Sequence, residues 1–179
     1  MQTCLSQRKS KSLSLAFLLL VFWFNEGLAQ GGIEEESLVA ALTLNTLRFT
    51  TWPQAFTTPF NLCVFADNVT EDAFVRLESK KIGSTSLHVV TLAHLNDLDQ
   101  CNALYIKEIK QNTLLQVFNQ LKKKPILTIG LAEHFAENGG MIGLRHDNDK
   151  LVIDINLQVL NESGIILSSR LLSLSNILK

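Results

Sequence analysis

Cysteine and recognisable catalytic motifs are scarce in this sequence of 179 residues. Its three cysteines include no Cys-x-x-Cys pair, which argues against a redox site. No Gly-x-Gly-x-x-Gly follows a predicted strand, so dinucleotide binding is unsupported. The motifs Gly-x-Ser-x-Gly and His-Glu-x-x-His are also missing, which removes the usual signatures of α/β-hydrolases and zinc peptidases. The sequence therefore predicts no catalytic residue.

Basic clusters and metal-ligand patterns are equally sparse. The net charge is −1, and the richest basic run, Lys122 to Lys124, ends a predicted helix, where cations interact favourably with the helix dipole. We therefore expect no nucleic-acid binding. The four histidines show no i,i+3 or i,i+4 pairing with one another, so we expect neither a metal site nor a cofactor. They are His88, His94, His134 and His146.

The N-terminal segment has the order of a secretory signal peptide. Arg8, Lys9 and Lys11 precede an apolar run over residues 13–24, and small residues occupy the −3 and −1 positions if cleavage follows Ala29. The alternative is a transmembrane anchor, but a spanning helix needs about 20 apolar residues, more than this run supplies. The sequence therefore predicts a signal peptide over residues 1–29 and a single exported domain over residues 30–179.

Cleavage after residue 29 would discard Cys4 and leave Cys63 and Cys101. An even pair of cysteines in an oxidising compartment usually forms a disulfide. Both residues lie in or next to predicted strands, and neighbouring strands lie about 5 Å apart, close enough for a bridge if the strands pair. Closing this loop would contribute about 4 kcal/mol in the chain-entropy model. The alternative is two buried free thiols.

Hydrophobic periodicity alternates between helix and strand through the middle of the chain. This alternation predicts an α/β fold: a mainly parallel sheet with helices on both faces plus an antiparallel hairpin, forming a three-layer sandwich. Thr70 is the expected N-cap of the second helix. We expect helices at 34–50, 71–79 and 111–123, strands at 60–66, 87–92, 102–106 and 125–130, a hairpin from 141–144 and 151–155, and one or two helices within 156–178, interrupted near Ser163 and Gly164.

The C-terminal stretch 164–178 is dense in aliphatic residues with small serines between them. One interpretation is a helix packed against the core. The other is a surface that docks a partner or a second copy, because large apolar patches on soluble domains mark interfaces.

Several segments occur in an order that resembles the YfiR family of periplasmic proteins. They include Leu-Asn-Thr-Leu-Arg-Phe-Thr-Thr-Trp-Pro at 44–53, Phe-Asn-Leu-Cys-Val at 60–64 and Cys-Asn-Ala-Leu-Tyr-Ile at 101–106. Phe-Ala-Glu-Asn-Gly-Gly-Met-Ile at 135–142, Asp-Ile-Asn-Leu at 154–157 and Leu-Ser-Ser-Arg-Leu-Leu at 167–172 complete the set. The resemblance covers nearly all of the chain after residue 29.

The resemblance implies a regulator and not an enzyme. Proteins of this type repress a membrane-bound diguanylate cyclase by binding its periplasmic region, which lowers cyclic-di-GMP and biofilm formation. An outer-membrane lipoprotein can sequester the repressor, and the family is dimeric and sensitive to its disulfide state. Cys63 and Cys101 match the family's first bridge, whereas a second cysteine pair near the hairpin is missing from this sequence. Redox control through that second pair is therefore in doubt here.

A repressor needs only a higher affinity for the inactive conformation of its receptor than for the active one. The expected contacts, which are equally suited to the core, are Ile142, Leu144, Ile165, Ile166 and Leu172. A competing hypothesis is a periplasmic small-ligand-binding domain that serves another membrane receptor. Its pocket would lie at the C-terminal ends of the parallel strands.

Overall fold

The structure is a computed structural model that describes residues 30–56, 59–96, 98–148 and 150–178. The predicted signal peptide at residues 1–29 lies outside these described residues. No helix within them is long and apolar enough to cross a membrane.

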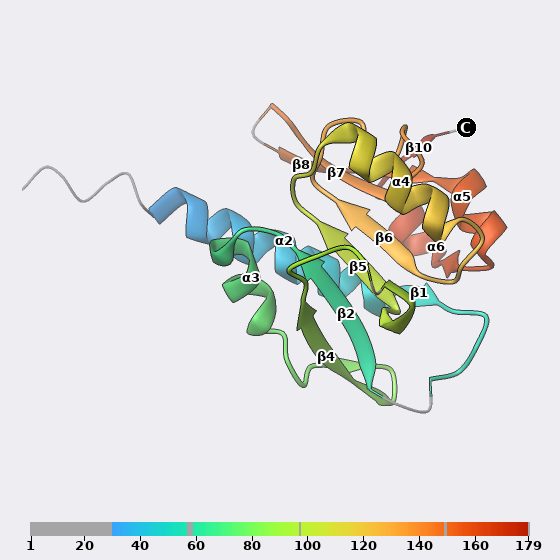
Figure 1. Ribbon diagram of the computed structural model, residues 1–179, viewed down its shortest axis with the longest axis horizontal. Helices are drawn as coiled ribbons and strands as arrows, with labels where there is room; N and C mark the ends of the chain where they lie inside the picture. Colours follow the sequence, from blue (N-terminus) through green and yellow to red (C-terminus); the bar gives the residue numbers. More distant parts are fainter. Residues whose placement is uncertain (1–29, 57–58, 97, 149, 179) are drawn as a thin grey trace, which may run out of the picture.

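An eight-stranded sheet forms the centre of the molecule (Figure 1). Its strands lie in the order β10-β8-β7-β6-β5-β2-β4-β3, and the five strands from β7 to β4 in this order run parallel. A separate antiparallel pair, β1 and β9, joins the end of the first helix to the C-terminal region. The strands are β1 (Thr50–Thr51), β2 (Phe60–Phe65), β3 (Lys81–Ile82), β4 (Thr85–Thr91), β5 (Ala103–Ile106), β6 (Leu127–Gly130), β7 (Ile142–Asp147), β8 (Lys150–Asn156), β9 (Ile166–Leu167) and β10 (Asn176–Leu178).

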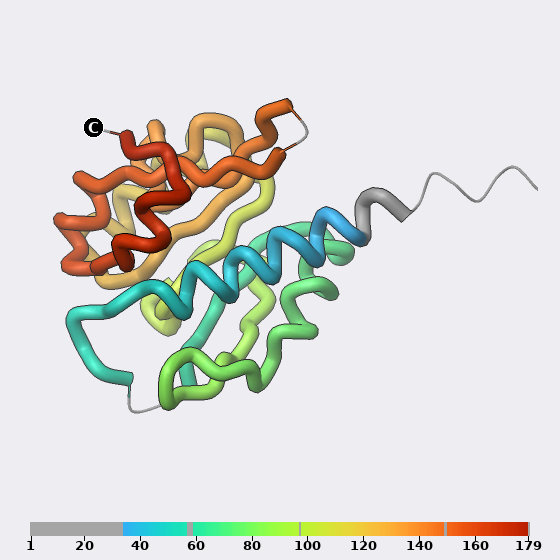
Figure 2. Tube along the Cα trace, turned by 180° about the vertical axis from the view of Figure 1, so that it is seen from behind, coloured from blue at the N-terminus to red at the C-terminus, as the bar shows by residue number. Residues whose placement is uncertain are grey.

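Helices cover both faces of this sheet, which confirms the predicted three-layer α/β architecture. Helices α2, α3, α5 and α6 pack on one face, and α4 with the 3₁₀ helix η2 packs on the other (Figures 1 and 2). The helices are α2 (Gln30–Arg48), α3 (Asn68–Val75), η2 (Leu98–Gln100), α4 (Gln111–Leu121), α5 (Leu157–Ser163) and α6 (Ser169–Leu172).

Strand β5 shows how the sequence builds two cores. All four of its residues are buried, and alternate side chains point to opposite faces of the sheet. Ala103 and Tyr105 join the larger core under α2 and α3, whereas Leu104 and Ile106 join the smaller core under α4. A strand covered on both faces must be apolar throughout, which is why its sequence is a continuous apolar run and not an alternating one.

The parallel strands have the order of a doubly wound sheet. From β2 the chain passes through α3 to β4 on one side, and β5 then pairs with β2 on the other side. The order of the strands therefore reverses between β2 and β5. In open α/β sheets, ligand sites form at such a switch point, outside the carboxyl ends of the strands.

The predicted hairpin is confirmed as the antiparallel pair β7 and β8, but its turn is shorter than expected. The strands stay paired as far as Asp147 and Lys150, so residues 145–147 belong to β7 and not to the turn. Their polar side chains had indicated a turn because the end of this strand lies in solvent.

The second predicted helix begins earlier than expected, and its cap is not Thr70. Helix α3 starts at Asn68, and the Asp67 side chain accepts a hydrogen bond from the backbone N–H of Thr70 at 2.9 Å. Thr70 is fully buried in the first turn of the helix. Asp and Thr both favour the N-cap position, so composition alone did not separate them.

The C-terminal region contains the two predicted helices, α5 and α6, and also two short strands that its aliphatic density did not predict. Helix α5 ends at Gly164, which has a positive φ of 74° and stops the helix where expected. Beyond it the chain forms β9, the short helix α6 and β10. Strand β10 pairs parallel to β8 and extends the central sheet by one edge strand. Each of these strands is only two or three residues long, too short for hydrophobic periodicity to identify.

Two glycines, Gly130 at the end of β6 and Gly140 shortly before β7, leave room for an aromatic ring between them. A Cβ atom on Gly130 would lie 2.2 Å from the ring of Phe135, and a Cβ atom on Gly140 would lie equally close to the opposite side of that ring. The ring also packs edge-on against Phe118 of α4, with centroids 5.1 Å apart. The loop after β6 is therefore held against the sheet by one inserted side chain.

We expect Gly130→Ala to destabilise the protein by about 1–3 kcal/mol, because the added methyl group overlaps the Phe135 ring. Urea unfolding measures this change. In a Phe135→Ala background the same substitution should cost almost nothing, because the overlapping ring has gone. An equal loss of stability from Gly130→Ala in the two backgrounds would show that the Phe135 ring does not depend on the absence of a side chain at residue 130.

Candidate functional site

Charged side chains meet at the switch point between β2 and β5. Lys107 directly follows β5, and Asp67 lies two residues after β2. The Lys107 ammonium donates hydrogen bonds to Oδ2 of Asp67 at 2.8 Å and to Oγ1 of Thr70 at 3.0 Å. It also donates to Oε1 of Glu36 on helix α2 at 2.5 Å. One lysine therefore connects a strand end, the start of α3 and the side of α2.

Burial and pairing compete at Lys107. Burial by itself would lower the pKa of Lys107, but its hydrogen bonds to Asp67 and Glu36 outweigh burial and raise the pKa above its ordinary value. The Lys107 side chain is 20% exposed, and that of Glu36 is 9% exposed. Removing one partner of such a pair leaves an uncompensated buried charge, which is strongly destabilising. We conclude that Lys107 first of all holds α2 and α3 together.

Asp67 acts twice at this point, as a helix cap and as an ion-pair partner. The hydrogen bond from Lys107, followed by that from the Thr70 backbone, lowers the pKa of Asp67 from 3.8 to about 2. Below it, burial followed by the charge of Glu36 raises the pKa of the Tyr105 hydroxyl, which has no hydrogen-bond partner among the described residues. The cluster is therefore anionic on balance, with a neutral phenol beneath it.

This cluster was not predicted from the sequence. The available signal was a charged residue placed directly after each of two buried strands, since the carboxyl ends of parallel strands meet at one edge of a sheet. Glu36 had no such signal, because it comes from a helix 71 residues away from Lys107.

A cavity of about 610 Å³ lies further along the carboxyl edge, between the loop after β6 and strands β7, β8 and β10. Asp154 accepts from Nε of Arg145 at 2.7 Å and from Nδ2 of Asn176 at 2.9 Å, which occupies both of its carboxylate oxygens. The hydrogen bond to Asp154 raises the pKa of Arg145. Small-molecule sites typically measure about 300–1,000 Å³, so the size is suitable. The charges on Arg145 and Asp154 are, however, already paired with each other.

Two of the four histidines, His134 and His146, line this cavity, and each side-chain ion pair seen for a histidine is with a carboxylate. His88 contacts Glu78 at 3.3 Å, His146 contacts Glu35 at 2.8 Å, and His134 bonds to Glu137. Within the described parts of the chain, no group of three or more His, Cys, Asp or Glu residues is arranged to hold a metal ion.

The expected partner contacts differ widely in exposure. Ile142, Leu144 and Ile165 are at most 2% exposed and belong to the larger core. Ile166 is 66% exposed in β9, and Leu172 is half-buried in α6. Only the last two side chains can reach a partner without rearrangement of the fold.

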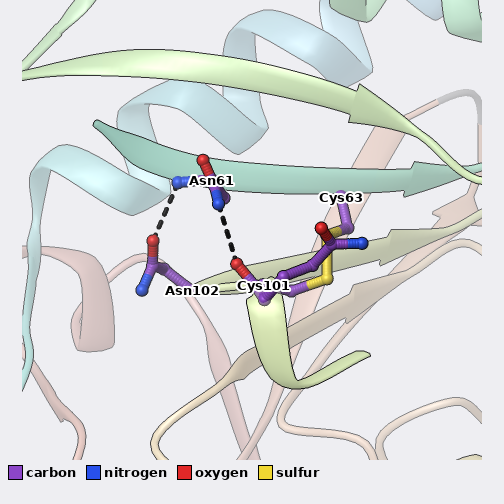
Figure 3. The surroundings of a disulfide bond; sticks show 5 residues. Asn61, Cys63, Cys101 and Asn102 are labelled. Atoms are coloured by element: carbon purple, nitrogen blue, oxygen red, sulfur yellow. Dashed lines mark hydrogen bonds between the residues drawn. A yellow bond between two sulfur atoms is a disulfide. The ribbon is translucent and has the colours of Figure 1, made fainter. Parts of the chain in front are cut away.

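Cys63 and Cys101 form a disulfide, with their Cα atoms 5.7 Å apart (Figure 3). Cys63 lies in β2, and Cys101 directly follows η2 on the α4 side of the sheet. The same two segments are joined by Asn61, whose backbone N–H donates to Oδ1 of Asn102 and whose side chain donates to the carbonyl of Gln100. Both cysteines are at most 3% exposed, so the bridge lies in the interior.

Comparison with known proteins gives a match to one family model. Residues 36–176 match the family model described as YfiR/HmsC-like. No curated protein matches the chain. The family match begins at Glu36 and therefore includes the charged cluster, the disulfide and the hairpin.

The pKa of Asp67 predicts a window of pH-dependent stability. A carboxyl whose pKa falls from 3.8 to about 2 on folding stabilises the protein fully above the higher value, and this contribution is lost as the pH falls through the lower one. We expect Asp67→Asn to lower stability at pH 7 and to flatten the pH dependence of the unfolding free energy across this window. Urea unfolding at a series of pH values measures both effects.

Asp72→Asn is the matched control, since Asp72 is an exposed carboxyl on the same helix. It should keep the wild-type slope. If Asp67→Asn also keeps the wild-type dependence of the unfolding free energy on pH, the ion pair between Lys107 and Asp67 does not contribute to stability.

Proposed function

Because the chain belongs to the YfiR/HmsC-like family, we propose that it is a periplasmic repressor of a membrane-bound diguanylate cyclase. The observation that carries this proposal is the family match over residues 36–176, which spans nearly all of the described domain. At the level of the family, membership supports a periplasmic regulator of cyclic-di-GMP signalling and not a catalyst. Repression of a diguanylate cyclase is the more specific part of this proposal.

Repression requires no reactive group. A protein that binds the inactive conformation of a receptor more tightly than the active one shifts the receptor toward inactivity by that difference in affinity. A rigid, cross-linked α/β domain suits such a task, because little conformational entropy is lost when its surface binds. The disulfide and the buried ion pairs support this reading.

The proposed receptor is the periplasmic region of an inner-membrane diguanylate cyclase. An outer-membrane lipoprotein that sequesters the repressor is a second proposed partner, and a homodimer is the proposed assembly. Repression would lower cyclic-di-GMP and so reduce biofilm formation.

The receptor contact is proposed at the corner formed by β9 and α6. Ile166 is 66% exposed there, and Leu174, just beyond α6, is 74% exposed. The Arg170 guanidinium lies over the Phe49 ring, 5.8 Å from its centroid, and connects this corner to the end of α2. Adjacent exposed apolar residues beside a cation are typical of protein-binding surfaces.

A small-ligand-binding domain that serves another membrane receptor is the second candidate. The cavity of about 610 Å³ at the carboxyl edge of the sheet favours it, because ligands of open α/β sheets bind at this edge. Because Arg145 and Asp154 in this cavity neutralise each other, the cavity indicates no ligand class, and we rank this function below repression.

Deleting the gene should raise intracellular cyclic-di-GMP, because the cyclase loses its repressor. The full gene should restore the original level, whereas a gene without the codons for residues 2–29 should not, because its product stays in the cytoplasm. Quantification of cyclic-di-GMP in cell extracts measures both. An unchanged level after deletion would count against repression, and thermal-shift titration with small metabolites would then test the second candidate.

Ile166→Glu should weaken repression, because it places a charge on the proposed contact without disturbing the core. We expect cyclic-di-GMP to approach the level of the deletion strain while the protein retains wild-type stability. Val69→Glu is the control, since Val69 is 53% exposed on α3, away from this corner. If both variants repress equally well, the contact lies elsewhere.

A further inference from the structure

Helix α2 carries an apolar stripe that is largely exposed, although its Leu42 also packs against the larger core. Leu38, Ala41, Leu42 and Asn45 follow one another at helical spacing along one side of the helix. Leu38 is 57% exposed, Ala41 and Asn45 are exposed, and Leu42 is half-buried. In Figure 2 helix α2 crosses the rear of the molecule, and no other described element is drawn in front of it.

The orientation of this stripe is fixed by the opposite side of the helix. Val39, Leu44 and Leu47 are buried in the larger core, and Thr43 and Thr46 are buried beside them. The ion pair from Glu36 to Lys107 holds the N-terminal half of the helix in the same rotation. The stripe therefore faces outward because of the fold, and not because of a freely rotating helix.

The stripe has a small residue at its centre and residues of opposite charge at its two ends. Ala41 has no side chain beyond Cβ, so a second helix can approach closely at that point. Glu34 lies near one end, about two turns before Ala41, and Arg48 lies the same number of residues after it. Both end residues are exposed.

We propose that this stripe binds the same stripe of a second copy, with the two α2 helices antiparallel and crossing at Ala41. Antiparallel pairing about Ala41 places Glu34 opposite Arg48 of the second copy, and two-fold symmetry repeats the pair at the other end. Leu38 and Leu42 of each copy flank the crossing and are removed from water. The antiparallel arrangement also aligns the two helix dipoles favourably.

This inference rests on the proposed homodimer and names its interface. A parallel pair would place Glu34 beside Glu34 and Arg48 beside Arg48, so like charges would disfavour it. A stable interface buries about 1,200 Å² or more in total, and one helix pair is small by that measure. We therefore expect a dissociation constant in the micromolar range.

Disulfide cross-linking tests the crossing point directly. In a Cys4→Ser background, Ala41→Cys adds a thiol at the position where the two helices are closest. The full gene is expressed, and the exported protein is purified and oxidised at a protein concentration of about 100 µM, where a micromolar dimer forms. Non-reducing electrophoresis should show most of the protein as a covalent dimer. Asn112→Cys, exposed on α4 at the opposite face of the sheet, is the matched control and should remain largely monomeric.

Charge and apolar variants test the register. Light scattering should show that Leu38→Glu weakens the dimer about tenfold or more, whereas Leu115→Glu, 39% exposed on α4, leaves it unchanged. Glu34→Arg and Arg48→Glu should each weaken the dimer, and the double variant should recover most of the loss because the pair is restored with reversed sign.

Three results would overturn the inference. One is a monomeric wild-type protein at this concentration, and a second is a dimer that cross-links no better through residue 41 than through residue 112. The third is a monomeric protein in which Leu38→Glu impairs only binding to the receptor region. That result would make the stripe a contact surface for the receptor and not for a second copy. Cyclic-di-GMP in the deletion strain is measured separately, so the interface can fail while repression stands.

Discussion

The ammonium group of Lys107 determines how the first helix lies on the sheet. It is the common partner of Glu36 on α2 and of Asp67 and Thr70 at the start of α3. Glu36 is buried and Lys107 is half-buried, and charges in such places are tolerated only when they are paired and hydrogen-bonded, so the lysine and its three partners depend on one another. Helix α2 has apolar residues on both of its sides, and this polar contact favours burial of the side that carries Glu36. Because the side with Glu36 is buried, Leu38 and Ala41 face outward.

Much of the fold could be predicted from the sequence because its central strands are short, apolar and bounded by polar segments. The run around Cys63 and that around Leu104 are buried on both faces, and such runs are hard to mistake once helices alternate with them. The disulfide could be predicted for a related reason: both cysteines lie beside strands that prove to be neighbours in the sheet. Chain order and strand spacing were sufficient in these cases.

The remaining features depend on contacts between distant residues, which a single sequence does not show. Helix α2 has apolar residues both at Leu38 and Leu42 and at Leu44 and Leu47, and helical spacing alone does not show which of them meet the sheet. Strands β9 and β10 were missed for a different reason: they are defined by pairing with β1 and β8, and not by their own composition. The charged cluster was missed because Glu36 and Lys107 are 71 residues apart in the sequence and only the fold brings them together.

The two proposed surfaces are connected through the end of α2. Phe49 follows that helix directly, lies under Arg170 and accepts the backbone hydrogen bond of Ser168, so the corner around Ile166 is attached to the same helix that carries the stripe. In an antiparallel dimer, the C-terminal end of each α2 lies beside the N-terminal half of the other. Each corner would then stand close to residues of the second copy, and a receptor bound there would contact both. Dimerisation would in that case raise receptor affinity without any change of fold, because the second copy only enlarges the surface that is buried.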